Sequence, residues 1–179
     1  MNEPSEPDPR LASELRESAG REWTEEAAED ERLTELGRRR NFSLSDLAKE
    51  MVNRGDRVSV EFGGHSFSGA VVSAGEDYVT VTGSGQIGEI RMATARWSIL
   101  PSGLAVEKGV GAAESFIAAL HQHAAAATNI RLTLSHADMV IGSIAVVAAD
   151  HLEVADVDGR RLFVPLEMVL GTIRSLEPH

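Results

Sequence analysis

The sequence predicts a mainly β protein made of two tandem five-stranded units, each preceded by a helix, with an acidic helical arm at the N-terminus. Three observations lead to this prediction. The segments 71–81 (VVSAGEDYVTV) and 144–154 (IAVVAADHLEV) have matching patterns of apolar and polar residues, 73 positions apart. Around both segments, apolar and polar residues alternate with the period of a half-buried strand. A stretch with the helical period precedes each alternating region.

Composition limits the classes of function. At 179 residues the chain is long enough for one ordinary domain or two small ones. It has no Cys, which excludes disulfides, thiolate metal sites and thiol catalysis. The start MNEPSEPDPR lacks the pattern of a signal peptide, and no apolar run approaches the length of a membrane span. We therefore expect a soluble, cytoplasmic protein with no membrane partner.

The charge balance argues against a general nucleic-acid binder. The net charge is −11, divided as −5, −2 and −4 over residues 1–40, 41–100 and 101–179. A protein that binds nucleic acid independently of sequence needs clustered Lys and Arg to displace counterions from the phosphates. Because no region is net basic, such binding is expected only through a small local patch.

Changes in composition predict the boundaries. Residues 1–9 hold three Pro among acidic residues, and we predict a disordered tail. Residues 10–40 are rich in helix formers, and we predict an exposed, acidic helical arm. Its charges are typical of a solvated helix face; a docking arm for a basic partner is the alternative. We place the first helix and its strands at 41–101, a linker at 102–110, and the second helix and its strands at 111–177.

The first unit begins with a helix and continues with strands. Ser43, followed by Asp46 three residues later, resembles a capping box, and Gly55 is typical of a helix C-terminus. Beyond Gly55 the apolar period changes from helical to alternating. Gly69 interrupts the predicted second strand, which indicates a bulge or sharp bend. The alternating apolar residues of the first strand are Val58, Val60 and Phe62.

The second unit follows the same order. We expect a helix over residues 112–123 and then five strands. The first hairpin differs from its counterpart by one residue. Beyond it the two copies align without a gap, so that Ile90 corresponds to Phe163 and Trp97 to Leu170.

This helix-plus-five-strand unit resembles the Sm-like (LSm) barrel, a small SH3-like β-barrel. The resemblance implies five strongly bent antiparallel strands in each copy, with Gly69 and Gly142 at the bend of the long second strand. A Cβ there would crowd the facing strand, so we expect both glycines to be critical for the fold. In the first copy the residues that carry the resemblance are Val58-x-Val60-x-Phe62, Phe67-x-Gly69, Asp77-x-Val79-x-Val81 and Ile90–Arg91. In the second copy they are Leu132-x-Leu134, Gly142, Asp150-x-Leu152-x-Val154, Leu162–Phe163–Val164 and Pro165.

The family is known for binding RNA and for subunits that associate through the exposed edge of a late strand. Its base-reading residues are not matched here. Val81–Thr82 and Val154–Ala155 stand in the region where the eukaryotic-type pattern has Asn, and Met92 follows Arg91 where that pattern has Gly. The resemblance therefore implies a fold and a mode of association more than RNA recognition. We expect the two units to pair with each other within the chain, or to form a low oligomer.

Other short motifs favour structural interpretations. GSGQIG at Gly83–Gly88 fits the dinucleotide-binding pattern, but a strand-like EIRM follows where that motif opens a helix, so we interpret it as a turn. Asp158–Gly159 is a second turn signal. His121 and His123 point apart on a helix, and Asp150–His151 face opposite sides of a strand. We predict no catalytic residue, no cofactor and no metal.

One basic cluster remains, Arg38–Arg40. At the end of a predicted helix, the helix dipole favours cations, which is a structural explanation of the cluster. The alternative is a phosphate-binding face made with arginines of the first unit. The candidate nucleic-acid contacts are then Arg38, Arg39, Arg40, Arg54, Arg57, Arg91 and Arg96.

Two functional hypotheses follow. The first is a non-catalytic interaction or regulatory module, whose tandem barrels bind another protein or each other through barrel edges. The second is an RNA- or DNA-binding regulator that uses the Arg cluster. The acidic balance of every region favours the first.

Overall fold

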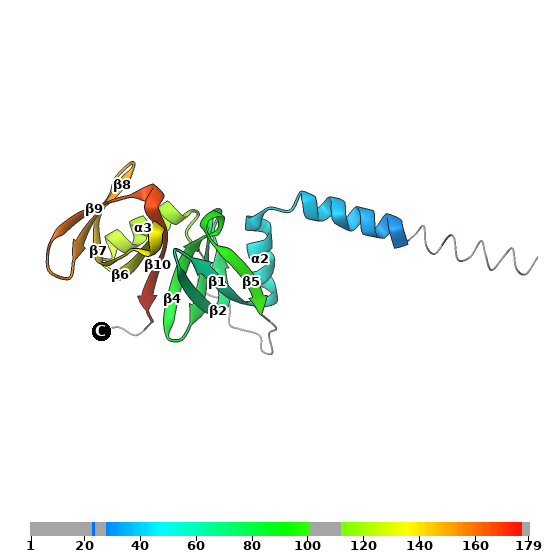
Figure 1. The fold of residues 1–179 in the computed structure, drawn as a ribbon, viewed down its shortest axis with the longest axis horizontal. Coiled ribbons are helices and arrows are strands. Elements are labelled where there is room, and N and C mark those ends of the chain that lie inside the picture. Colours follow the sequence, from blue (N-terminus) through cyan, green and yellow to red (C-terminus); the bar gives the residue numbers. More distant parts are fainter. Residues whose placement is uncertain (1–22, 24–27, 101–111, 177–179) are drawn as a thin grey trace, which may run out of the picture. The chain divides into compact units, whose positions relative to one another are not determined.

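The computed structural model describes residues 23, 28–100 and 112–176 (Figure 1). The predicted tail, most of the predicted arm and the predicted linker lie outside the described residues. The chain divides into two compact units, Met1–Phe42 and Ser43–His179. In the first unit, residues 28–40 form a helix.

The second unit consists mainly of strands, and the prediction of a mainly β protein is confirmed. The first five strands follow one helix and the next five follow another, in the predicted order. The elements are α2 (Leu44–Arg54), β1 (Arg57–Phe62), β2 (His65–Ala74), β3 (Tyr78–Gly83), β4 (Gln86–Arg91), η1 (Met92–Thr94), β5 (Arg96–Leu100), α3 (Phe116–Ala125), β6 (Asn129–Leu134), η2 (Ser135–Ala137), β7 (Met139–Val147), β8 (His151–Asp156), β9 (Arg161–Pro165), η3 (Leu166–Met168) and β10 (Val169–Ser175).

All ten strands belong to one antiparallel sheet, in the order β5-β1-β2-β3-β4-β10-β6-β7-β8-β9. We call β5-β1-β2-β3-β4 the first half and β10-β6-β7-β8-β9 the second half; in both, the fifth strand lies beside the first. The halves meet where β4 pairs with β10, which we call the seam, with Gly171 opposite Ile90 and Ser175 opposite Gln86. Pairing of the two predicted five-stranded units with each other was one of the two expected arrangements.

The sheet is open, which corrects the expectation of two separate barrels. Closing the first half would require β4 to pair with β5. Instead, β10 takes the hydrogen-bonding edge of β4, and β5 stays at one end of the sheet. The strand β9 lies at the other end.

The long second strands bend in the same way in both halves. Val71 lies opposite Val81, and Ile144 lies opposite Val154, and the register shifts directly after each pair. Each of the four pairs of β2–β3 recurs in β7–β8 73 positions later, and β7–β8 has one further pair, Gly142 with Asp156.

The gap-free alignment is wrong beyond β8. Val79 lies opposite Ile90, but Leu152, its counterpart, lies opposite Val164 and not opposite Phe163. By register, Phe163 therefore corresponds to Glu89.

The cause is the length of the hairpin. β3 and β4 are joined by a two-residue turn, in which Ser84 and Gly85 both have positive φ, so the Gly83–Gly88 motif lies on a hairpin as we interpreted it. Between β8 and β9 the carboxylate of Asp156 accepts hydrogen bonds from the backbone N–H groups of Asp158 and Arg160, at 2.9 and 2.8 Å, which holds a longer loop.

In the last strands, β5 and β10, the alignment of the two halves is shifted by one further residue. Val60 and Leu132 are equivalent, because each lies two residues beyond the partner of the strand-bending glycine. Opposite them lie Trp97 and Thr172. Trp97 thus corresponds to Thr172 and not to Leu170, because β10 contains a bulge that β5 lacks.

Gly69 and Gly142 lie on the bent strands, close to the backbone of the neighbouring strand. A Cβ on Gly69 would lie 2.1 Å from the carbonyl oxygen of Thr82, and a Cβ on Gly142 would lie 2.1 Å from that of Ala155. Because backbone atoms cannot move aside as a flexible side chain can, only glycine leaves room at either position.

Each half contributes side chains to the hydrophobic core of the other. Tyr78 of the first half belongs to the core of the second, whereas Leu170 and Ile173 of the second half belong to the core of the first. Burial of each such side chain stabilises the fold by roughly 1.5–3 kcal/mol. Neither half therefore has a complete core of its own.

Candidate functional site

A buried polar cluster lies at the seam. β4 contributes Glu89, β10 contributes Thr172 directly opposite, and α3 contributes His123. His123 Nε2 lies 2.6 Å from Glu89 Oε2, and the Thr172 hydroxyl donates to the same oxygen at 3.0 Å. Thr172 is 1% exposed and His123 is 7% exposed. The cluster thus joins both halves through one carboxylate.

Two opposing effects set the charge of Glu89. Burial raises the pKa of Glu89. The hydrogen bond and charge of His123, together with Thr172 and Arg174, lower the pKa by more than burial raises it, so the pKa lies below the ordinary 4.5. Glu89 is therefore ionised at neutral pH. Burial and the Glu89 charge together raise the pKa of Tyr78 to about 12, and the Tyr78 hydroxyl donates to the Ala113 carbonyl at 3.2 Å.

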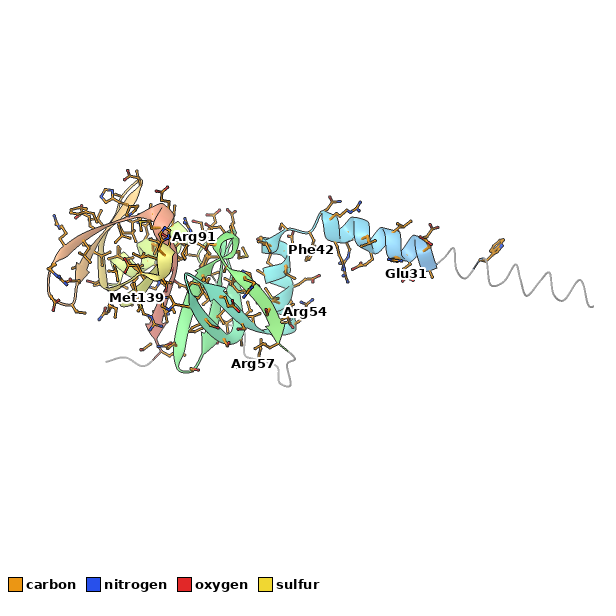
Figure 2. The ribbon with its side chains drawn as sticks, viewed as in Figure 1. Glu31, Phe42, Arg54, Arg57, Arg91 and Met139 are labelled. Carbon is orange, nitrogen blue, oxygen red and sulfur yellow. The ribbon has the colours of Figure 1, made fainter. Side chains whose placement is uncertain are left out.

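Arg91 binds the second half from the end of β4 (Figure 2). Its Nη1 donates to the carbonyl oxygens of Leu166 and Val169, at 3.2 and 3.4 Å. The guanidinium carbon lies 5.1 Å from the centre of the Phe116 ring, within cation–π range. This candidate nucleic-acid contact therefore takes part in joining the two halves.

Of the other candidate arginines in the second unit, Arg54 and Arg96 bind nearby carboxylates. Arg54 binds Glu50 at 3.0 Å and Asp56 at 2.7 Å, and Arg96 binds Glu61. Arg57 is exposed at the start of β1 (Figure 2).

The cluster Arg38–Arg40 lies in the first unit, on the helix over residues 28–40. Arg38 and Arg39 bind the carboxylate of Glu35, at 3.0 and 2.8 Å, one turn earlier on the helix. Arg40 is exposed on the same helix. These pairs are the expected neighbours on a helix surface, three and four residues apart.

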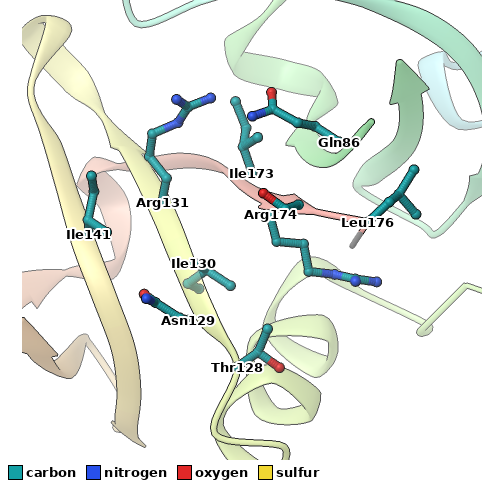
Figure 3. A pocket seen from close by; sticks show the side chains of 10 residues that line it. Gln86, Thr128, Asn129, Ile130, Arg131, Ile141, Ile173, Arg174 and Leu176 are labelled. Atoms are coloured by element: carbon teal, nitrogen blue, oxygen red, sulfur yellow. The ribbon is translucent and has the colours of Figure 1, made fainter. Parts of the chain in front are cut away.

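A pocket of about 700 Å³ lies where β4, β6 and β10 come together (Figure 3). Its polar lining includes Gln86, Asn129, Arg131 and Arg174. Arg131 lies opposite Ile173, so the next residue, Arg174, points to the other face of the strand. Figure 3 shows the two guanidinium groups directed apart. The pocket therefore lacks the converging cations that an anionic ligand needs.

The role of His123 was missed by the sequence analysis. His121 is exposed, whereas His123 is buried against Glu89. The signal was present in the sequence: Phe116, Leu120 and His123 follow the i, i+4, i+7 spacing of one helix face. In the described part of the chain, no three His, Asp or Glu side chains are grouped in a way that could hold a metal ion.

Asp150 and His151 differ from the expectation that they face opposite sides of a strand. His151 Nδ1 lies 2.7 Å from Asp150 Oδ1. The contact forms because β8 begins at His151, which leaves Asp150 in the preceding turn. The Asp150 side chain is 89% exposed, and the hydrogen bond and charge of His151 lower its pKa.

The two ends of the sheet are the remaining candidate surfaces. β5 and β9 each pair with a single neighbour within the described ranges. An end strand presents a row of unpaired N–H and C=O groups on which another strand can form. Both ends also expose large apolar side chains: Ile99 on β5 is 52% exposed, and Phe163 on β9 is 61% exposed.

Comparison with known proteins does not add a family. No protein-family model matches this sequence, and no curated protein matches it. Within the described residues, every helix is too short or too polar to cross a membrane.

Proposed function

We propose that this chain is a non-catalytic interaction module, built from two duplicated Sm-like halves, that binds another protein or a second copy of itself through the ends of its sheet. The strand order carries this proposal. The seam joins a fourth strand, β4, to a fifth strand, β10, and the strands left at the ends are again a fifth and a fourth, β5 and β9. The kind of pairing used inside the chain thus remains available at both ends.

The Sm-like assignment is supported by the common architecture of the halves. Both have a helix followed by five strands, with the fifth strand beside the first. The shared register of β2–β3 and β7–β8, and the crowded glycine in each bend, further support a duplication.

Nucleic-acid binding is the less favoured function, because most of the candidate arginines already have partners. Four of the seven bind carboxylates, and Arg91 binds carbonyl oxygens of the second half. Retention on immobilised RNA or DNA that survives about 0.2 M salt would reverse this preference.

Lysines placed at both ends of the sheet test the proposal. In the double variant Ile99→Lys, Phe163→Lys, charges on the end strands oppose the addition of a further strand. We expect this variant to lose association, measured as the mass in light scattering of the full chain or as co-purification of another protein from cells that express it. Ile141→Lys is the matched control, because Ile141 is 47% exposed but lies on the inner strand β7. Association that is equally strong in the double variant would contradict the proposal.

A further inference from the structure

The seam and the ends of the sheet hold different side chains at equivalent positions. By register, Phe163 on β9 is the equivalent of Glu89 on β4. Trp97 on β5 is likewise the equivalent of Thr172 on β10. The facing pair Glu89–Thr172 of the seam therefore has a counterpart, Phe163–Trp97, that is divided between the two ends of the sheet.

The helices extend this equivalence. α2 and α3 are capped by Ser43 and Ser115. Met51 and His123 each lie eight residues after the capping serine of their helix. Met51 is thus the counterpart of the histidine that binds Glu89 at the seam.

The two sets of residues differ in chemistry. The seam has the polar set His123, Glu89 and Thr172. The ends have an apolar set in which Met51 and Trp97 line one small apolar pocket beside β5, and Phe163 is 61% exposed on β9. Within one chain Phe163 lies at the opposite end of the sheet from this pocket.

We infer that the partner is a second copy of this chain, whose β9 pairs with β5 in the register of the seam and whose Phe163 packs on Trp97. This inference rests on the proposed function and names the partner. It joins different surfaces of the two copies, so the contact is head-to-tail. The transferred register brings no like charges together: the facing pairs are Val164–Arg96, Phe163–Trp97, Leu162–Ser98, Arg161–Ile99 and Arg160–Leu100.

The polar set at the seam and the apolar set at the ends also favour the pairings β4 with β10 and β9 with β5 over the two alternatives. If β9 replaced β4 at the seam, Phe163 would lie against His123 and would remove its carboxylate partner. If β4 of one copy paired with β5 of another, Glu89 would be buried against Trp97. A polar or ionised group that is buried without a partner is disfavoured, so both wrong pairings are opposed.

Disulfide cross-linking between copies tests the register, because the chain has no cysteine of its own. Full-length Arg161→Cys is mixed with full-length Ile99→Cys and oxidised mildly. Facing residues of antiparallel strands lie within the Cα separation that a disulfide spans. We expect the mixed dimer to be the main product. Pro165→Cys mixed with Ile99→Cys is the out-of-register control and should give little product.

A second arm tests the role of Phe163. Adding Phe163→Ser to the Arg161→Cys chain should lower the yield of mixed dimer at least tenfold, while far-UV circular dichroism and the melting temperature stay close to those of the parent variant. An unchanged yield would contradict the packing of Phe163 on Trp97. Cross-linking of Arg161→Cys to itself, as efficient as in the mixture, would show that β9 pairs with β9 and would overturn the head-to-tail arrangement.

The outcomes separate this inference from the proposed function. If association is abolished by the lysine double variant but no cross-link forms in the stated register, the inference fails and the proposed function stands. If association survives the lysine double variant, both fail.

Discussion

Glu89 is a charged residue of the first half that binds side chains of the second half. Its carboxylate is satisfied by His123 from α3 and by Thr172 from β10, and its side chain is only 14% exposed. A buried carboxylate that loses such partners leaves an uncompensated charge, which makes the cluster sensitive to substitution and to acid.

We expect Glu89→Gln to lower the free energy of unfolding at neutral pH by roughly 1–3 kcal/mol, because the amide replaces charge-assisted hydrogen bonds with weaker ones. The folded-state pKa of Glu89 lies below the ordinary 4.5, so the contribution of the carboxylate is complete above that value and is lost as the pH falls through the folded-state pKa. The difference between wild type and variant, measured by urea unfolding, should therefore shrink in acid. A difference that is independent of pH would contradict the role of the charge.

The control for this experiment is Glu61→Gln. Glu61 binds Arg96 on the surface, and its side chain is 51% exposed. An exposed ion pair contributes little, so the free energy of unfolding should change by less than about 1 kcal/mol.

Gly142 supports a second prediction at the scale of a residue. We expect Gly142→Ala to destabilise the fold by about 1–3 kcal/mol or more, because the new Cβ would lie 2.1 Å from the Ala155 carbonyl oxygen and must displace a strand. Gly88→Ala is the matched control in the same sheet, since its nearest neighbours are side-chain atoms of Phe67 at 3.4 Å. The melting temperatures of the two variants provide the comparison, and equal melting temperatures would contradict the prediction.

Single residues were predictable from the sequence only where their role is local. The interruption of a strand by Gly69 and the capping of a helix by Ser43 follow from the residues around them. The contact of His123 with Glu89 joins residues 34 positions apart, and it depends on β4 lying beside β10. A local pattern indicates that His123 is buried but does not identify its partner.

At the scale of the elements, the first half helps to start a helix of the second. The N–H of Phe116, the first residue of α3, donates to the Asp77 carboxylate at 2.7 Å. The hydroxyl of Ser115 accepts from a second free N–H of the first turn, at 3.3 Å. Asp77 lies in the turn between β2 and β3, so this turn fixes where α3 begins.

We expect Asp77→Ala to lower the free energy of unfolding by about 1 kcal/mol, the usual contribution of an N-terminal capping side chain. Asp150→Ala is the matched control, because Asp150 is the equivalent turn residue of the second half and its side chain is 89% exposed. Chemical denaturation of both variants gives the comparison. A larger loss in Asp150→Ala would show that the two turns have the opposite roles.

The order and type of the elements were predictable because the hydrophobic period changes clearly between helix and strand. The alignment of the last strands was not. The loop held by Asp156 adds one residue before β9, and the bulge of β10 adds another. Turn and bulge geometry decide such offsets, and a pattern with a period of two cannot detect a single extra residue within a loop.

At the scale of the molecule, the shared cores make Ser43–His179 one folding unit. Tyr78, Leu170 and Ile173 each complete the core of the other half. The sequence indicated two units but not an open sheet, because the choice between closing each half and joining the halves depends on competition between distant edges.

We expect Ser43–His179 to unfold in one cooperative step. In the full chain carrying Trp23→Phe, Trp97 is the only tryptophan and reports on the first half. Its fluorescence and the far-UV circular dichroism should give coincident urea transitions with one midpoint. Two separated transitions would show that the halves are independent.

The most direct test of the account is hydrogen–deuterium exchange of the backbone amides of β5 and β9 as a function of protein concentration. If the ends of the sheet bind a second copy, exchange in 96–100 and 161–164 slows together as the concentration rises, and exchange in the inner strand β7 stays constant. Exchange in both end strands that is fast at every concentration would contradict the account.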